Sequence, residues 1–258
     1  MLPIYTSDSQ GRLSLKPIIQ LIFEQVYDFG IRDFCFVVGR GKRAIEDHFT
    51  PDYHYQYLLG DKNGHILDLE NFYKKLKKST IFWVNQSPNL GFGHAVLQAE
   101  SYITDDEFFV FAGDTLIVSR ESQHLRRLVS CYENEVADAA FLTQRVSDPE
   151  NYGIVYGVES QQEVHVNRVV EKPLRPDSNL AIMPIYIFKK QIFKFLRNVR
   201  PDHRNEIQLT DAIQSTITKG KVIATRIMED ELRLEIGSPE TYFNAQVDSF
   251  KYSVKTPK

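Results

Sequence analysis

One stretch of the sequence reads Gln86-Ser-Pro-Asn-Leu-Gly91-Phe-Gly93-His94-Ala-Val-Leu-Gln-Ala-Glu, continues through a polar turn, and ends in Phe108-Phe-Val-Phe-Ala-Gly113-Asp114. A run rich in aromatic and β-branched residues over 81–84 precedes it and predicts a strand. Proline and glycine interrupt regular structure after that strand, and we expect a helix over 94–101. The final apolar run predicts a buried strand that places Asp114 just past its carboxyl end, where open α/β sheets bind ligands.

The rest of the chain supports an α/β fold. Before the central stretch we expect a helix over 17–30, a strand over 34–38, a short helix up to residue 49 and a helix over 67–78. After it we expect a helix over 124–134 and a strand over 139–144. Strands that alternate with helices favour βαβ units and a mostly parallel sheet.

The second half follows a different pattern. Three strand-like runs over 153–159, 164–170 and 180–188 have little helix between them, which predicts an antiparallel extension of the sheet. Helices over 189–199, from residue 206 and from residue 239 through 250 follow, with short strands over 222–228 and 232–236. The last helix has the signature of a helix start, because Ser238 precedes Pro239 and an acidic residue follows in the first turn.

Length and composition exclude several classes of protein. The 258 residues suffice for one large domain, which we expect to span residues 1–258. A net charge of −3, from 31 basic and 34 acidic residues, indicates no nucleic-acid partner. No apolar run could span a bilayer and no signal segment opens the chain, so we expect a cytoplasmic protein without a membrane partner. Cys35 and Cys131 are interpreted as buried free thiols.

Gln86 and the glycines that follow it are candidates for binding a nucleotide base. The side-chain amide of Gln86 offers one donor and one acceptor, which match the imide edge of uracil or thymine. Glycines at a helix start let backbone N–H groups approach a ligand closely. A surface glutamine beside an ordinary loop is the alternative, but the sequence context favours base binding by Gln86 and Gly91. His94 is interpreted as a helix-start or packing residue.

Two further motifs could carry charge chemistry. Asp114 could simply end a strand, but as a ligand of Mg²⁺ it would need a second carboxylate, and the candidate is Glu235. The strand that ends in Glu171-Lys172-Pro173 could present a solvent-facing turn, or a lysine suited to phosphate. The segment Gly39-Arg-Gly41-Lys42 also lies between a strand and a helix, yet two glycines fall short of a phosphate-loop fingerprint. We interpret it as a tight turn with solvated basic side chains.

Several of these motifs, taken in order, resemble a known family. The pattern Gln-x-x-x-x-Gly-x-Gly-His-Ala with a following strand that ends in Asp is similar to the bacterial and archaeal UTP–glucose-1-phosphate uridylyltransferases, and more broadly to the sugar-1-phosphate nucleotidyltransferases. Further matching segments are Asn151-Tyr-Gly153, Glu171-Lys-Pro173, Asn179-Leu-Ala-Ile and Glu206-Ile-Gln-Leu-Thr-Asp211. The last of these reads from its residues as a structural helix start. The resemblance covers nearly the whole chain.

The resemblance implies a fold, a reaction and site residues. The fold would be a Rossmann-like, GT-A-like nucleotidyltransferase domain with a mixed, mostly parallel sheet. The reaction would join an NTP to a sugar 1-phosphate, with UTP and glucose 1-phosphate favoured, and release pyrophosphate. Asp114 and Lys172 would be catalytic, and Asp114 and Glu235 would hold Mg²⁺. Gln86 and Gly91 would bind the base, and sugar contacts would come from Gly153, Glu171 and Asn179. We also expect a homo-oligomer.

The chain departs from this family at three points. Members usually carry Asp at the position of Glu235, which is longer by one C–C bond of about 1.5 Å. Many members have glycine where this chain has Pro184. Members open with a strand, a glycine-rich loop with an arginine, and a lysine shortly before Leu-Pro, whereas the printed sequence starts at Met1-Leu-Pro3. We therefore expect an N-terminally truncated domain with an open strand edge beside residues 34–38, and a poor catalyst unless an upstream segment is present.

Two other classes of function stay open on the sequence alone. A non-catalytic nucleotide-sugar binder or regulatory homologue is favoured by the missing loop. A glycosyltransferase with a similar nucleotide-binding sheet would commonly carry Asp-x-Asp at its metal. The segment Gly113-Asp114-Thr115-Leu116 offers only one carboxylate, which counts against that class.

Overall fold

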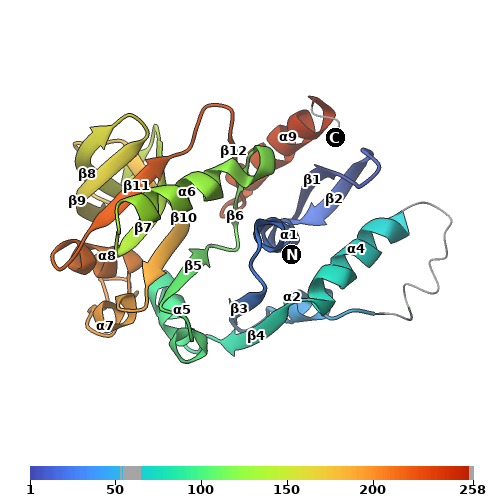
Figure 1. Ribbon diagram of the computed structural model, residues 1–258, viewed down its shortest axis with the longest axis horizontal. Helices are drawn as coiled ribbons and strands as arrows, with labels where there is room; N and C mark the ends of the chain where they lie inside the picture. Colours follow the sequence, from blue (N-terminus) through green and yellow to red (C-terminus); the bar gives the residue numbers. More distant parts are fainter. Residues whose placement is uncertain (53, 55–64, 256–258) are drawn as a thin grey trace.

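Six strands form the largest sheet of the computed structural model, which describes residues 1–52, 54 and 65–255 (Figure 1). Their order across the sheet is β5-β10-β7-β11-β9-β8. The strands are β5 (Glu107–Phe111), β7 (Ala139–Arg145), β8 (Gly153–Ser160), β9 (Glu163–Glu171), β10 (Leu180–Lys189) and β11 (Val222–Arg226). Each overlaps a strand that the sequence predicts, so the α/β class is confirmed.

The expectation of a mostly parallel sheet is wrong. Within the described residues, strands pair in parallel only between β7 and β11 and between β3 (Asp33–Val38) and β4 (Thr80–Asn85). Strands β8 and β9 form an antiparallel hairpin, and β10 runs antiparallel to β5, β7 and β8. A parallel connection needs a long crossover, usually a helix, and no helix separates β8, β9 and β10 along the chain. The predicted antiparallel extension is therefore the dominant part of this sheet.

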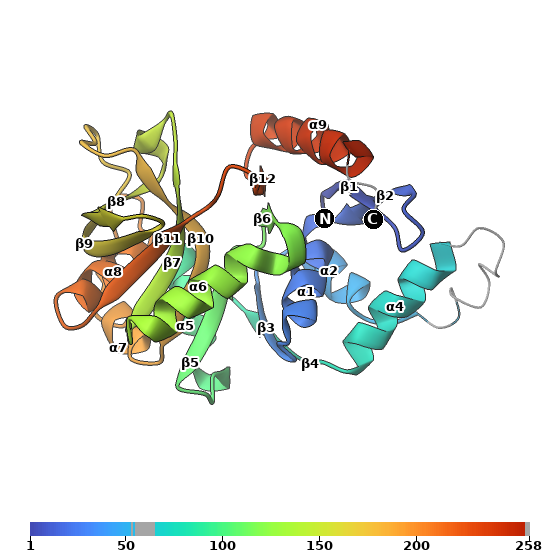
Figure 2. The same ribbon diagram turned by 45° about the horizontal axis from the view of Figure 1, so that its top comes forward.

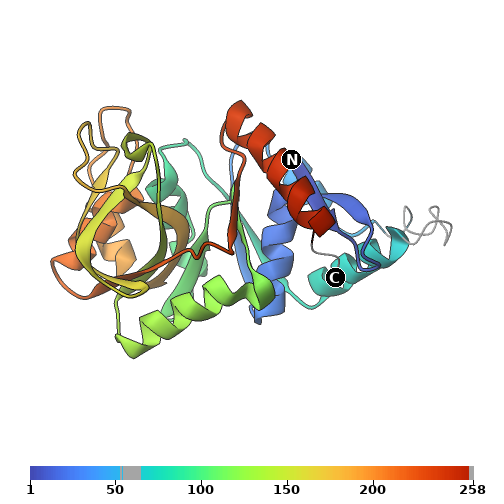
Figure 3. The same ribbon diagram turned by 90° about the horizontal axis from the view of Figure 1, so that it is seen from above.

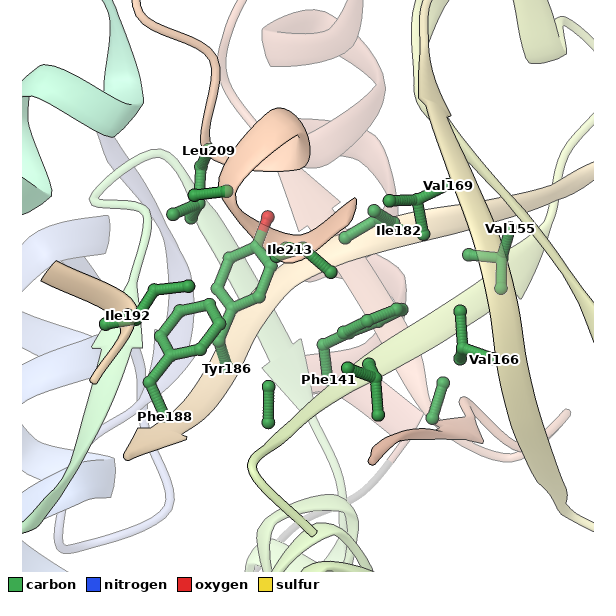
Figure 4. Packing of buried hydrophobic residues seen from close by; sticks show 14 of the residues in the cluster. Phe141, Val155, Val166, Val169, Ile182, Tyr186, Phe188, Ile192, Leu209 and Ile213 are labelled. Carbon is green, nitrogen blue, oxygen red and sulfur yellow. The ribbon is translucent and has the colours of Figure 1, made fainter. Parts of the chain in front are cut away.

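Helices cover both faces of the six-stranded sheet, because alternate residues of a strand point to opposite faces. On one face α6 (Gln123–Asn134) buries Leu125 and Leu128 in one cluster with Ala140 and Leu142 of β7. On the other face α5 (Phe92–Gln98), α7 (Ile192–Leu196) and α8 (Leu209–Ile217) contribute side chains to a second cluster, which contains the fully buried Phe141 and Phe188 (Figure 4). The helices on the two faces hold the sheet in place, and the ends of its strands carry the candidate site.

Several helices differ in their bounds from those that the sequence predicts. Helix α7 covers only Ile192–Leu196 of the expected 189–199. Helix α8 begins at Leu209 instead of residue 206, because the backbone of Ile207 forms hydrogen bonds with Leu90 and Gly93 instead of with a helical neighbour. Helix α5 ends at Gln98 and is followed by a 3₁₀ turn, η1 (Glu100–Tyr102). Tertiary contacts, which local sequence does not encode, explain the shift of α8.

Strands β3 and β4 form a second, two-stranded sheet that packs against α1 (Ile18–Phe29), α2 (Arg43–His48) and α4 (His65–Lys77). Aromatic rings fill this core: the ring of Phe23 lies 4.7 Å from Phe34, 5.3 Å from Phe49 and 5.9 Å from Phe72. Helix α1 begins after Pro17 and ends at Gly30. The φ of Gly30 is 121°, a conformation that residues with a side chain rarely adopt. The predicted helix over 17–30 is thus confirmed.

A groove separates the two sheets. Within the described part of the chain, β3 pairs with β4 alone and β5 pairs with β10 alone (Figures 1 and 2). The facing edges of β3 and β5 line one cavity of about 2100 Å³. The apolar residues of β3 are consequently half-buried up to Val37, whereas those of β7 are fully buried up to Thr143. Among the residues that the structure describes, no strand pairs with the other edge of β3, so the open edge expected beside residues 34–38 is present there.

Two pairings that join distant parts of the chain complete the fold. A hairpin of β1 (Pro3–Ser7) and β2 (Leu13–Pro17), which the sequence analysis did not predict, packs against α9 (Pro239–Lys255) (Figure 3). The Oγ of Ser238 accepts a hydrogen bond from the Thr241 N–H at 3.1 Å and so caps α9 as expected. Strand β6 (Thr115–Val118) pairs with β12 (Leu232–Glu235).

Both cysteines are free thiols, as expected. Cys131 is buried, and burial raises its pKa to about 12. Cys35 is only half-buried, because β3 borders the groove, and burial raises its pKa to about 11. Both side chains therefore stay protonated near neutral pH. None of the described helices is long and apolar enough to cross a membrane.

Candidate active site

The glycine loop after β4 packs against the segment 206–208. The N–H of Gly93 donates to the Ile207 carbonyl at 3.0 Å, and the Ile207 N–H donates to the Leu90 carbonyl at 2.7 Å. A Cβ atom on Gly93 would lie 2.6 Å from the Ile207 oxygen, and one on Gly91 would lie 2.9 Å from Cβ of Glu206. Glycines at a helix start could bring backbone N–H groups to a ligand, but the N–H of Gly93 is occupied by this neighbouring segment. The glycines are needed so that this segment can approach.

The side-chain amide of Gln86 is already oriented at the end of β4. Its Nε2 donates to the Gly91 carbonyl at 3.0 Å and lies 3.1 Å from Nδ1 of His94. The other ring nitrogen of His94 lies 3.1 Å from Nε2 of Gln98. The His94 ring, which belongs to α5, therefore lies between the side-chain amides of Gln86 and Gln98. Among the described residues, these contacts leave Oε1 of Gln86 as the side-chain atom available to accept a hydrogen bond from a base.

Asp114 and Glu235 come together from strands far apart in the sequence. Asp114 directly precedes β6, where Thr115 pairs with Glu235 of β12, and the Ile236 N–H donates to the Asp114 carbonyl at 2.9 Å. A Cβ atom on Gly237 would lie 3.4 Å from Oε1 of Glu235 and 3.8 Å from Oδ2 of Asp114. Two carboxylates thus face one small volume at the cavity wall. Among the described residues, no group of three or more His, Cys, Asp or Glu side chains could hold a metal.

The charge of Glu235 is influenced by its surroundings. Burial raises the pKa of Glu235, and the carboxylates of Asp114 and Asp148 add to this, whereas the guanidinium of Arg233 lowers it. Nη2 of Arg233 lies 3.6 Å from Oε2 of Glu235. A cation placed between Glu235 and Asp114 would stabilise the charged form of both carboxylates.

Arg233 is a site residue that was not predicted from the sequence. It donates to the hydroxyl of Tyr152 at 3.3 Å, and its guanidinium carbon lies 5.4 Å from the centre of the Tyr152 ring. Arg233 therefore connects the carboxylate of Glu235 to the segment that contains Gly153. The sequence signal was the spacing of two along a strand, which places Arg233 and Glu235 on one face of β12.

Glu171 and Lys172 are neighbours in the chain, and both line the cavity. Successive residues of a strand point to opposite faces, so this arrangement requires a change of backbone conformation. Strand β9 ends at Glu171, and Lys172 has a left-handed φ of 40°. Nζ of Lys172 lies 3.9 Å from Oε1 of Glu171, and the Lys172 N–H donates to the Tyr152 carbonyl at 3.0 Å. A positive and a negative group thus stand side by side in the cavity.

The second oxygen of Glu171 has a partner that was not predicted. The hydroxyl of Thr210, in the first turn of α8, donates to Oε2 of Glu171 at 2.7 Å. Gly153 pairs with Glu171 between β8 and β9, and a Cβ there would lie 3.2 Å from both oxygens of this hydrogen bond. The segment Glu206–Asp211, interpreted from sequence as structural, therefore also supplies a residue at the cavity.

One cavity of about 2100 Å³ contains nearly all the predicted site residues, namely Gln86, Gly91, Asp114, Gly153, Glu171, Lys172 and Glu235. Pro184 also lines it, beside the irregularity in the β10–β7 register. Asn179 lies elsewhere: its Oδ1 accepts from Nη1 of Arg145 at 2.8 Å, and both residues line a separate hollow. The geometry gives no support to a sugar contact from Asn179. The basic residues Arg40 and Lys42 are exposed in a tight turn, as expected.

Comparison with known proteins identifies the family of this arrangement. A family model described as nucleotidyl transferase matches residues 12–251. A UTP–glucose-1-phosphate uridylyltransferase of Bacillus subtilis is 36% identical over 239 residues, which cover 90% of this chain and 78% of the relative. An enzyme of the same name from Staphylococcus haemolyticus is 34% identical over 248 residues, which cover 94% of this chain and 83% of the relative.

Solved structures agree with these matches. An apo UDP-glucose pyrophosphorylase superposes with a TM-score of 0.84 at 28% identity, over 92% of this chain and 88% of that one. A UDP-glucose pyrophosphorylase in complex with UDP-glucose covers the same shares at the same identity with a TM-score of 0.80. A UTP-bound enzyme from Acinetobacter baumannii, also 28% identical, has a TM-score of 0.80 over 94% of this chain and 84% of that one.

Proposed function

The chain belongs to the nucleotidyl transferase family, and we propose that it joins UTP to glucose 1-phosphate, forming UDP-glucose and pyrophosphate. One observation carries this proposal: a single cavity gathers an oriented glutamine amide, two converging carboxylates and an adjacent Glu–Lys pair. The relatives named as UTP–glucose-1-phosphate uridylyltransferases and the neighbours bound to UDP-glucose and UTP support the choice of substrates.

The reaction is a transfer of a uridylyl group without a covalent enzyme intermediate. A phosphate oxygen of glucose 1-phosphate attacks the α-phosphorus of UTP, and the bond from that phosphorus to the pyrophosphate oxygen breaks. Catalysis of this kind depends on alignment of the reacting groups and on neutralisation of their charge. Lys172 would hold the attacking phosphate, because its ammonium group is a compact charge on the cavity side of the chain.

The carboxylates of Asp114 and Glu235 fit a divalent cation such as Mg²⁺. Their oxygens face one small volume from two paired strands, and Mg²⁺ prefers oxygen ligands from one or two carboxylates together with substrate phosphates. The additional length of Glu235, compared with the aspartate usual in the family, does not prevent this approach. When bound, the ion would neutralise phosphate charge and orient the phosphates.

Gln86 would select the base, and Glu171 would bind the sugar. Oε1 of Gln86 would accept from the imide N–H of uracil, while its Nε2 stays with Gly91 and His94. Oε1 of Glu171, which lies on the side of Lys172, would accept from sugar hydroxyls. These roles predict a preference for uracil nucleotides and for a sugar with free hydroxyl groups.

The test is a panel of four NTPs and several sugar 1-phosphates, with pyrophosphate release as the measurement. We expect release with UTP and glucose 1-phosphate above every other pair. A chain that binds UDP-glucose in calorimetry, yet releases no pyrophosphate with any pair, would instead be a nucleotide-sugar binder. A chain that does neither, both as printed and with an N-terminal extension that supplies a strand and a glycine-rich loop, would contradict the proposal.

A further inference from the structure

The hydrogen bond between Thr210 and Glu171 has no role in the reaction described above. We propose that Thr210 is a positioning residue that fixes the Glu171 carboxylate in the orientation that receives the sugar, an inference that rests on the proposed function. The distance from Oγ1 of Thr210 to Oε2 of Glu171 is 2.7 Å, and Thr210 is only 7% exposed. This contact joins α8 to the end of β9, two elements 39 residues apart in the chain.

The carboxylate needs such a partner because its terminal torsion is soft. Rotation about the last bond of a glutamate side chain is broad and roughly two-fold. The Thr210 hydroxyl has a single proton, and donating it to Oε2 removes this freedom. Oε1 then lies on the side of Lys172, 3.9 Å from its Nζ. The position of Oε1 of Glu171, which would bind the sugar, is thereby fixed relative to Nζ of Lys172, which would bind the sugar phosphate.

Thr210 is itself rigidly mounted. Its helical neighbours Leu209, Ala212 and Ile213 are buried in the core on the sheet face that also holds Phe141 (Figure 4). The hydroxyl therefore moves only if the helix moves. Gly153 lies directly against this hydrogen bond. A Cβ added at Gly153 would lie 3.2 Å from Oε2 of Glu171, from Oγ1 of Thr210 and from a methyl group of Ile182.

The experiment compares Thr210→Val and Thr210→Ser with a matched control, Thr216→Val. Valine keeps the shape of threonine and removes the donor, whereas serine keeps the donor. Thr216 lies in the same helix and is 1% exposed, but its hydroxyl donates to the Ala212 carbonyl at 3.0 Å instead of to Glu171. Calorimetry measures the affinities of UDP and UDP-glucose for each protein. Steady-state kinetics measures KM for UTP and for glucose 1-phosphate.

We expect Thr210→Val to weaken UDP-glucose binding about ten-fold or more, as for the loss of a hydrogen bond to a charged group, and to leave UDP binding unchanged. KM for glucose 1-phosphate should rise while KM for UTP stays constant. Thr210→Ser should restore both values, and Thr216→Val should match the parent chain. Equal UDP-glucose affinities in the parent chain and Thr210→Val would overturn the inference.

Failure of the proposed function gives a different result. If the parent chain binds UDP-glucose no better than UDP, the sugar subsite itself is absent and the proposed function is at fault. If Thr210→Val does not fold, Thr210→Ala supplies the same loss of donor with a smaller side chain. Wild-type selectivity for UDP-glucose in a folded Thr210→Ala protein would count against the inference equally.

Discussion

Lys172 follows Glu171 directly, yet the two side chains line the same cavity, because Lys172 adopts a left-handed backbone with φ of 40°. A non-glycine residue in this region costs about 1–2 kcal/mol. Such strain persists where the surrounding structure imposes it, often at functional sites. Here the anchor is the hydrogen bond from the Lys172 N–H to the Tyr152 carbonyl at 3.0 Å.

Because of this conformation, two substitutions at Lys172 can distinguish its effect on turnover from its effect on stability. We expect Lys172→Gly and Lys172→Ala to lose turnover alike, because both lack the ammonium group. In urea unfolding, Lys172→Gly should be more stable than Lys172→Ala by about 1 kcal/mol, because glycine adopts a positive φ without strain. A Lys172→Ala protein of equal or greater stability would contradict the left-handed assignment, and undiminished turnover would remove Lys172 from the mechanism.

Gly93 is expected to be intolerant of substitution for a structural reason. Gly93→Ala would place Cβ 2.6 Å from the Ile207 oxygen, so we expect a loss of about 1–3 kcal/mol in the free energy of unfolding. Gly39→Ala is the control, because an added Cβ there meets only the Gln86 carbonyl oxygen, at 3.9 Å. Denaturant titration of both variants checks this. Equal stability of the two would show that the glycine loop and the segment 206–208 are not in contact.

Local sequence patterns predict some parts of this structure and not others. The sequence from residue 81 to Asp114 predicts two strands and a helix because their apolar patterns are local, and all three are present with shifts of a few residues. The packing of Gly93 against Ile207, the pairing of β6 with β12 and the contact of Thr210 with Glu171 each join segments far apart in the chain. No local pattern encodes such contacts, so the start of α8 and the contact of Thr210 were missed. Arg233 was missed although its spacing of two residues from Glu235 is a local signal.

Buried His124 predicts a pH dependence of stability. Burial, with a smaller effect of Arg127, lowers the pKa of His124 to about 3, while the unfolded chain has the ordinary value near 6.5. Between these values the unfolded state binds the extra proton, so stability should fall as the pH drops from about 6.5 towards 3, by at most about 1.4 kcal/mol per pH unit from this group. His124→Gln should flatten that slope in urea unfolding at pH 4–7. An unchanged slope would mean that other groups dominate.

The groove between β3 and β5 predicts uneven protection of the backbone. In the described part of the chain, the edges of β3 and β5 that face the groove have no partner strand. Their amide groups should exchange with solvent deuterium much faster than those of β7, which has partners on both sides. Hydrogen exchange followed by mass spectrometry of peptides over 33–38, 107–111 and 139–145 measures this. Protection of all three peptides at the level of β7 would indicate that the edges of β3 and β5 are covered.

The role of the two carboxylates is tested by pyrophosphate release from UTP and glucose 1-phosphate in the presence of Mg²⁺, measured for the parent chain and for Asp114→Asn. Asp248→Asn, which changes an exposed carboxylate on α9, serves as the control. We predict that Asp114→Asn loses turnover by at least about 100-fold and keeps the unfolding midpoint of the parent, because the asparagine retains the shape of the side chain but not its charge. Turnover of Asp114→Asn within a few-fold of the Asp248→Asn control would contradict the proposed mechanism.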